Sequence, residues 1–306
     1  MQRRLADYLI ISLKGIAMGA ADAVPGVSGG TIAFISGIYE ELITTISNID
    51  LSLFKTLFKK GVVSFWTALN GNFLLALLLG IVVSFVSFMR LAKYLLENHP
   101  ILIWSFFFGL IVASIYFVGK QIKQWNVSVI VALLTGAVIA FYVSQLPSLA
   151  TNENSWFLFI AGAIAICAMI LPGISGSFIL IILGAYKTLS DALHDFDFKK
   201  ISIFAVGAII GLLSFSHALK WLFKHYHNIT LAILTGFIFG SLNKIWPWKE
   251  TLTWHTDSKG IKTPLLQESV SPFSFDGDNQ LLFAILLMIV GFLTIFILEK
   301  LGSKKS

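Results

Sequence analysis

Residues 24–31 read VPGVSGGT, and residues 171–177 repeat nearly the same stretch as LPGISGS. The second stretch lies inside an uncharged run over residues 155–186, which at ~1.5 Å per residue would form a helix longer than the ~30 Å hydrocarbon layer of a bilayer. Proline removes a backbone donor and glycine removes side-chain restraint, so a helix cannot continue undisturbed through either stretch. Both stretches therefore predict a helix that is broken within a membrane.

The composition of the whole chain is that of a membrane protein. Of its 306 residues, 57% are hydrophobic and 12% are charged, against about 25% charged in ordinary soluble domains. The mean hydropathy is +0.84. About six spanning helices are expected, over the uncharged runs 71–89, 101–119, 127–146, 201–216, 228–243 and 280–298.

Several function classes are excluded by what the sequence contains. The net charge of +6 is explained by basic cytoplasmic loops, so no nucleic-acid partner is expected. A single cysteine, Cys167, cannot form a disulfide framework or a cysteine-based metal site, and the histidines are not at ligand spacing. Without a G-x-x-x-x-G-K-[ST] loop, a nucleotide-driven engine is not indicated. We expect no metal and no cofactor.

The two halves of the chain align with each other. Ten of the residues between 25 and 50 match partners 147 positions later, and a second set of pairs lies 127 positions apart because the second half lacks a loop segment. The pairs include Pro25/Pro172, Ser28/Ser175, Gly29/Gly176, Gly37/Gly184, Tyr39/Tyr186, Gly80/Gly207 and Gly109/Gly236. Matched Pro, Gly, Ser and Tyr in the same order indicate an internal duplication.

This duplication predicts an all-α polytopic membrane protein with an inverted-topology repeat. Each copy holds three spans and one broken element, so the second copy is inverted if the broken element is a re-entrant helical hairpin. The first repeat is expected over residues 1–146 with its hairpin over 8–46, and the second over 155–306 with its hairpin over 155–193. Overall Lys and Arg placement favours re-entrant elements and cytoplasmic termini, which puts the loop over 244–279 outside although that loop carries four Lys.

The broken elements predict an anion-binding site. The second half of each hairpin begins with small residues, free backbone N–H groups and the positive end of a helix dipole, which together suit a phosphate. The expected phosphate-binding residues are Ser28, Gly29, Gly30, Thr31, Ser175, Gly176 and Ser177. The alternative is a kink used only for helix packing, because Gly and Pro are common in membrane helices.

Four ionisable residues are further candidates. Arg90 ends the first span, and its repeat partner is His217; each suits a phosphate near one membrane surface, with interfacial snorkelling of cations as the alternative. Asp22 precedes Pro25 in an otherwise uncharged stretch, where it is a proton carrier, a partner for broken-helix N–H groups or a water-exposed group. Glu40 is expected at a solvated hairpin base, with a secondary or coupling site as the alternative.

The pair PGVSGG and PGISGS, each followed by an apolar arm ending in Gly-x-Tyr, and ADAVPGVSGGTIAF near the N-terminus resemble the bacterial polyprenyl-phosphate transporter family over essentially the whole chain. The resemblance implies a bacterial plasma-membrane translocase, not an enzyme. Its partners would be membrane lipids and undecaprenyl phosphate, the carrier of cell-wall precursors, which it returns from the outer to the inner leaflet. The second motif departs from the first in having Ser177 for Gly30 and no aspartate.

Two other functions fit the same plan. Undecaprenyl-pyrophosphate phosphatases also resemble inverted repeats with Pro-Gly-x-Ser elements, but their motif has an arginine where this chain has Gly29 and Gly176. Loss of that charge would remove stabilisation of the transition state, which argues against hydrolysis. A secondary transporter of a small anionic solute is the second alternative.

Overall fold

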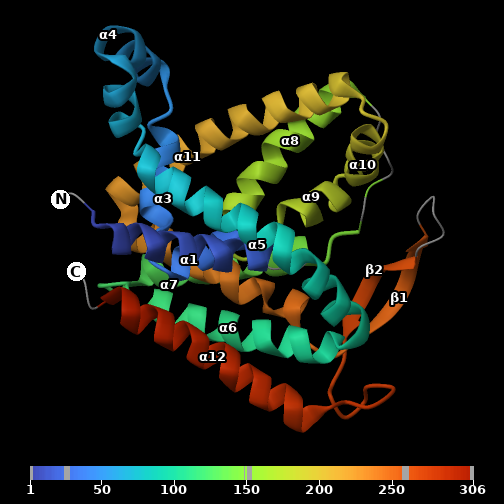
Figure 1. The fold of residues 1–306 in the computed structure, drawn as a ribbon. Coiled ribbons are helices and arrows are strands. Elements are labelled where there is room, and N and C mark those ends of the chain that lie inside the picture. The colour runs from blue at the N-terminus through green and yellow to red at the C-terminus, as the bar shows by residue number, and fades with distance from the viewer. Residues whose placement is uncertain (1–2, 24–27, 148, 150–153, 257–261, 304–306) are drawn as a thin grey trace.

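The computed structural model describes residues 3–23, 28–147, 149, 154–256 and 262–303 and is mostly helical (Figure 1). In chain order the elements are α1 (Leu5–Asp22), α2 (Gly29–Ile35), α3 (Tyr39–Ser47), α4 (Leu51–Ala68), α5 (Gly71–Asn98), α6 (Pro100–Gly119), α7 (Val127–Ser144), α8 (Ser155–Ile170), α9 (Gly176–Ile182), α10 (Tyr186–His194), α11 (Phe198–Gly240), the 3₁₀ helix η1 (Ser241–Ile245), β1 (Lys249–Thr256), β2 (Lys262–Ser269) and α12 (Leu281–Ser303).

The helices of the second half follow those of the first at the two offsets found in the sequence. Both ends of α9 and α10 lie 147 positions after those of α2 and α3, and α11 begins 127 positions after α5. The kink of α11 at Tyr226 (φ −135°, ψ 46°) corresponds to His99 (φ −138°, ψ 51°), which separates α5 from α6. The two halves therefore break their helices at equivalent positions.

Glycines hold the helices together at equivalent positions in both halves. A Cβ added at Gly15 on α1 would collide with the carbonyl O of Leu77 on α5. The equivalent Gly162 on α8 would collide with the carbonyl O of Phe204 on α11, which lies 127 positions after Leu77. Small residues of this kind let helix backbones approach closely, which is how helices associate in lipid.

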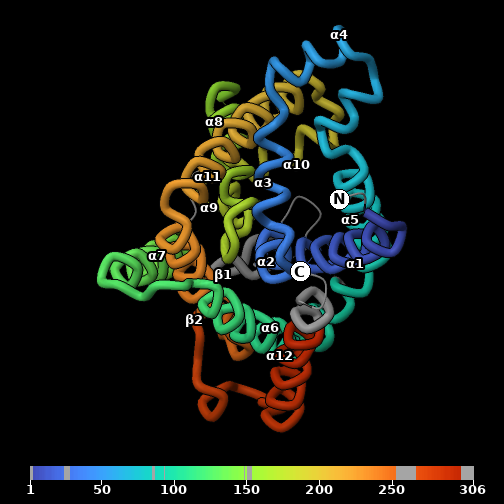
Figure 2. Tube along the Cα trace, turned by 90° about the vertical axis from the view of Figure 1, so that its left-hand side faces the viewer, coloured from blue at the N-terminus to red at the C-terminus, as the bar shows by residue number. Residues whose placement is uncertain are grey.

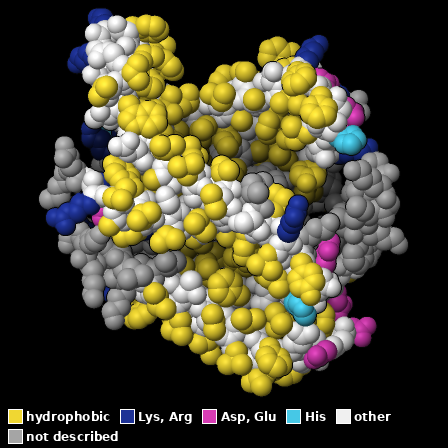
Figure 3. All heavy atoms as spheres, in the orientation of Figure 1, with side chains coloured by type: hydrophobic (Ala, Val, Ile, Leu, Met, Phe, Trp, Pro, Cys, Tyr) yellow, Lys and Arg dark blue, Asp and Glu magenta, His cyan; other side chains and the backbone are white. Residues whose placement is uncertain are grey.

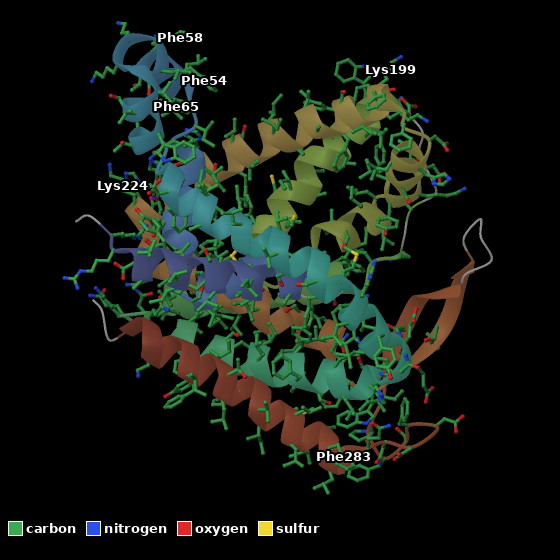
Figure 4. All side chains as sticks on the ribbon, viewed as in Figure 1. Phe54, Phe58, Phe65, Lys199, Lys224 and Phe283 are labelled. Carbon is green, nitrogen blue, oxygen red and sulfur yellow. The ribbon has the colours of Figure 1, made fainter. Side chains whose placement is uncertain are left out.

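Within the described residues, four helices are long and apolar enough to cross a membrane: Gly71–Asn98, Pro100–Gly119, Val127–Ser144 and Phe198–Ile245. The pair α9 and α10, bent by 108°, would make a fifth span if it is counted as one. The last of the four, α11, folds back on itself. It starts near Lys199, crosses the molecule to Lys224, kinks at Tyr226 and returns toward β1 and β2 (Figures 1 and 4). The start of α1, the end of α12 and α3 lie on one side, and α10, β1 and β2 lie on the other (Figure 1).

The outer faces of the helices are apolar. Figure 3 shows hydrophobic side chains over most of the visible surface, with charged groups mainly at the edges. Large exposed hydrophobic residues include Leu78 and Leu79 on α5, Val138 on α7, and Ile289 and Leu293 on α12. In water such a surface would be unfavourable, whereas lipid tails suit it. The protein is a membrane protein.

Two segments form elements that the sequence analysis did not predict. The segment expected as an extracytoplasmic loop contains an antiparallel hairpin in which Lys249 pairs with Ser269 and Thr256 with Lys262. Threonine and Trp254 in this segment favour strand structure, which a reading for apolar runs does not detect. The segment joining α3 to α5 forms α4, whereas α10 and α11 are joined by residues 195–197 alone.

Candidate functional site

The two helix interruptions meet in the structure. Ser28 Oγ, at the start of α2, donates a hydrogen bond to the carbonyl O of Met169 at the end of α8, at 3.1 Å. In return the backbone N–H of Gly173 donates to Thr31 Oγ1 at 2.9 Å. Ser28 and Thr31 are buried, with 2% and 0% of their surface exposed. The two interruptions are therefore joined directly, through Ser28 and Thr31 of the first motif and through Met169 and Gly173 of the second.

The first interruption is closed by the chain's own groups. The N–H of Gly29 donates to Asp22 Oδ1 at 2.6 Å, and the N–H of Gly30 donates to Ser28 Oγ at 3.1 Å. A Cβ at Gly30 would lie 2.5 Å from the carbonyl O of Ile170. The first N–H groups of α2 thus already have acceptors, and a carboxylate occupies the place expected for phosphate.

Of the three roles expected for Asp22, the structure shows the partner of broken-helix N–H groups. The carboxylate oxygen accepts a charge-assisted hydrogen bond at the positive end of α2, as an anion would. Pro25 and the rest of the 24–27 segment lie outside the described residues.

The second interruption is more open. Ser175 takes the place of Ser28 at the start of α9 but makes no side-chain capping hydrogen bond. Instead, Ser175 Oγ and Ser177 Oγ are hydrogen-bonded to each other at 2.9 Å, and Ser177 is exposed. Gly173 has φ +85°, which favours glycine, and a Cβ there would lie 2.7 Å from the carbonyl O of Phe237. Gly176 is buried against the carbonyl O of Ala165 and serves packing.

A lysine lies beside this open interruption. Lys244, in η1, lines a small pocket together with Gly173, Ser175, Phe178 and Ser144. Its Nζ sits 4.2 Å from the centre of the Phe178 ring, which is a cation–π distance. The Lys244 ammonium group and the Ser175 hydroxyl at this pocket are donors of the kind that a phosphate accepts, whereas the Ser144 hydroxyl already donates to the carbonyl O of Phe141.

A second lysine, Lys249, contacts the backbone of Lys244. Lys249 Nζ donates to the carbonyl O of Lys244 at 2.5 Å and lies 3.9 Å from the centre of the Trp104 ring. Burial and, to a smaller extent, the nearby charge of Lys244 together lower the pKa of Lys249 to about 7. None of the ion pairs within the described residues involves either lysine. The Lys244 ammonium group, which has no carboxylate partner in these ion pairs, favours an anion from outside the chain.

Sequence reasoning missed Lys244 as a site residue. It placed this lysine in an extracytoplasmic loop, whereas η1 continues α11 and carries the side chain to the second motif. The available signal was the presence of lysines in the loop over 244–279, because loops outside the cytoplasm are usually poor in Lys and Arg.

The other predicted cations and carboxylates do not reach the second interruption. Arg90 is exposed on α5, and no hydrogen bond or ion pair within the described residues joins it to either motif. His217 Nδ1 lies 2.7 Å from the carbonyl O of its own helix neighbour Leu213. Glu40 Oε1, on α3, lies 3.1 Å from His227 Nε2, just after the kink of α11. Glu40 therefore belongs to a polar cluster on the side of the termini.

Comparison with known proteins places the chain in a family. Residues 18–263 match the family model described as VCA0040-like, undecaprenyl phosphate translocase-like. The chain belongs to this undecaprenyl phosphate translocase-like family. It is 46% identical over 308 residues to a polyprenyl-phosphate transporter of Vibrio cholerae, covering 99% of this chain and 100% of the relative. It is 33% identical over 254 residues to a polyprenyl-phosphate transporter of Staphylococcus aureus, covering 77% of this chain and 85% of the relative. No solved structure matches.

The family membership confirms the resemblance seen in the doubled Pro-Gly motifs. The matched region contains both helix interruptions as well as Arg90, Lys244 and Lys249. Both relatives are named as transporters rather than as enzymes.

Proposed function

We propose that this chain moves undecaprenyl phosphate, or a related polyprenyl phosphate, across the bacterial plasma membrane from the outer to the inner leaflet. Its headgroup site is the second interruption, where Ser175, Ser177 and Lys244 hold the phosphate. The observation that carries this proposal is the position of Lys244 in one pocket with Ser175. The names of the two relatives supply the substrate class.

The geometry suits a lipid whose headgroup alone enters the protein. A phosphate bound by an ammonium group and hydroxyls gains charge-assisted hydrogen bonds, which are stronger where water is scarce. Because the outer faces of the helices are apolar, the long polyprenyl tail can stay among the acyl chains of the bilayer. The return of the lipid to the inner leaflet would supply the carrier again for cell-wall polymer synthesis.

The proposed architecture is an inverted repeat of residues 1–146 and 155–306, with six spans, two re-entrant hairpins and cytoplasmic termini. The recurrence of element bounds supports it, as does the position of α3 and α10 on opposite sides (Figure 1). Single cysteines at Lys123 and Phe273, in a Cys167→Ala background, test the orientation. An impermeant thiol reagent added outside should label Phe273→Cys and spare Lys123→Cys; the reverse pattern, or labelling of both, would overturn it.

Hydrolysis is the rival function, and the first interruption argues against it. Asp22, the carboxylate at the motifs, is engaged by the N–H of Gly29, and glycines stand where phosphatases have a charge clamp. The test is transbilayer movement of undecaprenyl phosphate in proteoliposomes, together with phosphate release from undecaprenyl pyrophosphate in the same preparation. Movement without phosphate release is expected. Release of phosphate would identify an enzyme, and well-inserted protein that moves no lipid would favour a solute transporter.

A further inference from the structure

Helix α4 is an addition to the fold that the two halves share. It fills the connection between α3 and α5, where the second half has only residues 195–197 between α10 and α11. In both views α4 lies at the upper edge of the molecule, beyond α3 (Figures 1 and 2). The shared fold does not need this segment, so it serves a purpose of its own.

The first part of α4 separates apolar from basic side chains. Leu51, Phe54 and Phe58 recur at helical spacing and are 80%, 48% and 85% exposed. Lys55 and Lys59 lie on an adjacent face, and Lys60 follows. The sequence of α4, residues 51–68, contains no Asp or Glu. A helix with an apolar face and only basic charges is typical of one that lies on an anionic membrane surface.

The second part of α4 folds back and enlarges the apolar face. Gly61 has φ +80° and turns the chain, so that the rings of Phe54 and Phe65 come within 6.3 Å of each other (Figure 4). Val62 and Val63 after the turn are 69% and 81% exposed. Leu53 is the buried residue of the helix, so few of its apolar side chains are covered by the protein itself.

We propose that α4 is a membrane-surface anchor that binds anionic phospholipid. The side chains of Leu51, Phe54 and Phe58 enter the boundary between headgroups and acyl chains, and the three lysines contact lipid phosphates. Charge complementarity selects this occupant, because an all-basic helix attracts anionic headgroups and not neutral ones. The proposal requires only that the protein is embedded in a membrane, and it does not depend on the substrate. With cytoplasmic termini, the anchor lies on the inner leaflet.

Spin labels on the full-length chain test this anchor. In a Cys167→Ala background, a nitroxide is attached at Phe58→Cys or, as a matched control on the polar face, at Ser52→Cys. Each protein is placed in nanodiscs of phosphatidylcholine alone or mixed with phosphatidylglycerol. Accessibility to oxygen is compared with accessibility to a water-soluble nickel chelate. With phosphatidylglycerol, the ratio of oxygen to nickel accessibility at residue 58 should exceed that at residue 52 by about threefold or more.

Two further comparisons identify the occupant. High salt, or the triple change Lys55→Gln, Lys59→Gln and Lys60→Gln, should lower the ratio at residue 58 in phosphatidylglycerol discs to its value in phosphatidylcholine. Equal immersion in both lipids would overturn the role of anionic lipid, and nickel access at residue 58 equal to that at residue 52 would overturn the anchor. Immersion seen only in discs that hold two copies would assign the face to a second copy of the chain. Lipid transport by the triple variant reports that it is folded.

Discussion

The two helix interruptions have nearly the same sequence, but their polar groups are hydrogen-bonded in different ways. At the first, Asp22 accepts the N–H of Gly29, and Ser28 is buried against the second motif. At the second, Met169 stands in the place of Asp22, Ser175 lines a pocket together with Lys244, and Ser175 Oγ is hydrogen-bonded to Ser177 Oγ. The carboxylate of Asp22 therefore closes the first motif, whereas the second motif has methionine at the equivalent position.

This contrast shows how a duplicated element can take two roles. The positive end of a broken helix attracts an anion in either copy. In the first copy the chain supplies that anion itself, which ties α1 to α2. In the second copy the chain supplies cations and hydroxyls, and the phosphate headgroup would supply the anion. Four changes break or sharpen this comparison, with the largest expected effect first.

A bulky residue at Gly30 should have the largest effect. In Gly30→Val the new side chain meets the carbonyl O of Ile170, so the contact between the two motifs cannot form. We expect destabilisation of about 1–3 kcal/mol or more and loss of transport, measured by thermal unfolding in detergent and by lipid movement. Gly119→Val is the matched control, because nothing lies within 4 Å of a Cβ there. Equal stability of the two variants would contradict the interlocked motifs.

Removal of the Lys244 ammonium group should come next. In Lys244→Met the pocket keeps its shape and loses its charge, so lipid transport should fall about 30-fold without a change in folding. Lys199→Met, at the exposed start of α11 (Figure 4), is the control and should transport normally. Normal transport by the Lys244 variant would remove this lysine from the headgroup site.

The equivalent serines should respond in opposite ways. Ser28→Ala loses a cap on Gly30 and a bond to Met169, so the free energy of unfolding should fall by about 1 kcal/mol. Ser175→Ala loses no cap, so its stability should be unchanged while transport falls about fivefold. Thermal unfolding and transport measured on both proteins decide the matter. If Ser175→Ala proves the less stable of the two, the assignment of roles is wrong.

The smallest effect is expected for Asp22→Asn. The amide Oδ1 can still accept the hydrogen bond from Gly29, so transport should stay within about threefold of the unchanged protein. Asp22→Leu, which removes the acceptor, should be clearly less stable. Complete loss of transport in a well-folded Asp22→Asn protein would show that Asp22 carries a proton.

The sequence predicted much of the fold because membrane helices leave strong signals. Long apolar runs marked the helices, and the matched Pro-Gly stretches marked both interruptions and the offsets between equivalent elements. The β1–β2 hairpin and α4 were missed, since their residues are polar or mixed and lack a long apolar run.

The site was less predictable because it depends on contacts between distant segments. The two motifs look alike in sequence, and only the position of Asp22 against Gly29 shows that the first is closed. Lys244 reaches the second motif through the path of α11 and η1, which no local pattern specifies. Arg90 was chosen because it ends an apolar run, and its role in headgroup binding stays a prediction.

The most direct test of the account is transbilayer movement of undecaprenyl phosphate by the double variant Ser175→Ala/Ser177→Ala in proteoliposomes, beside the unchanged protein and Ser28→Ala at equal amounts of folded protein. The account predicts at least a tenfold loss of movement in the double variant, since two hydroxyl donors to the phosphate are removed. Folded Ser28→Ala should still move the lipid. Movement at the unchanged rate by the double variant would show that the phosphate does not bind at the second interruption.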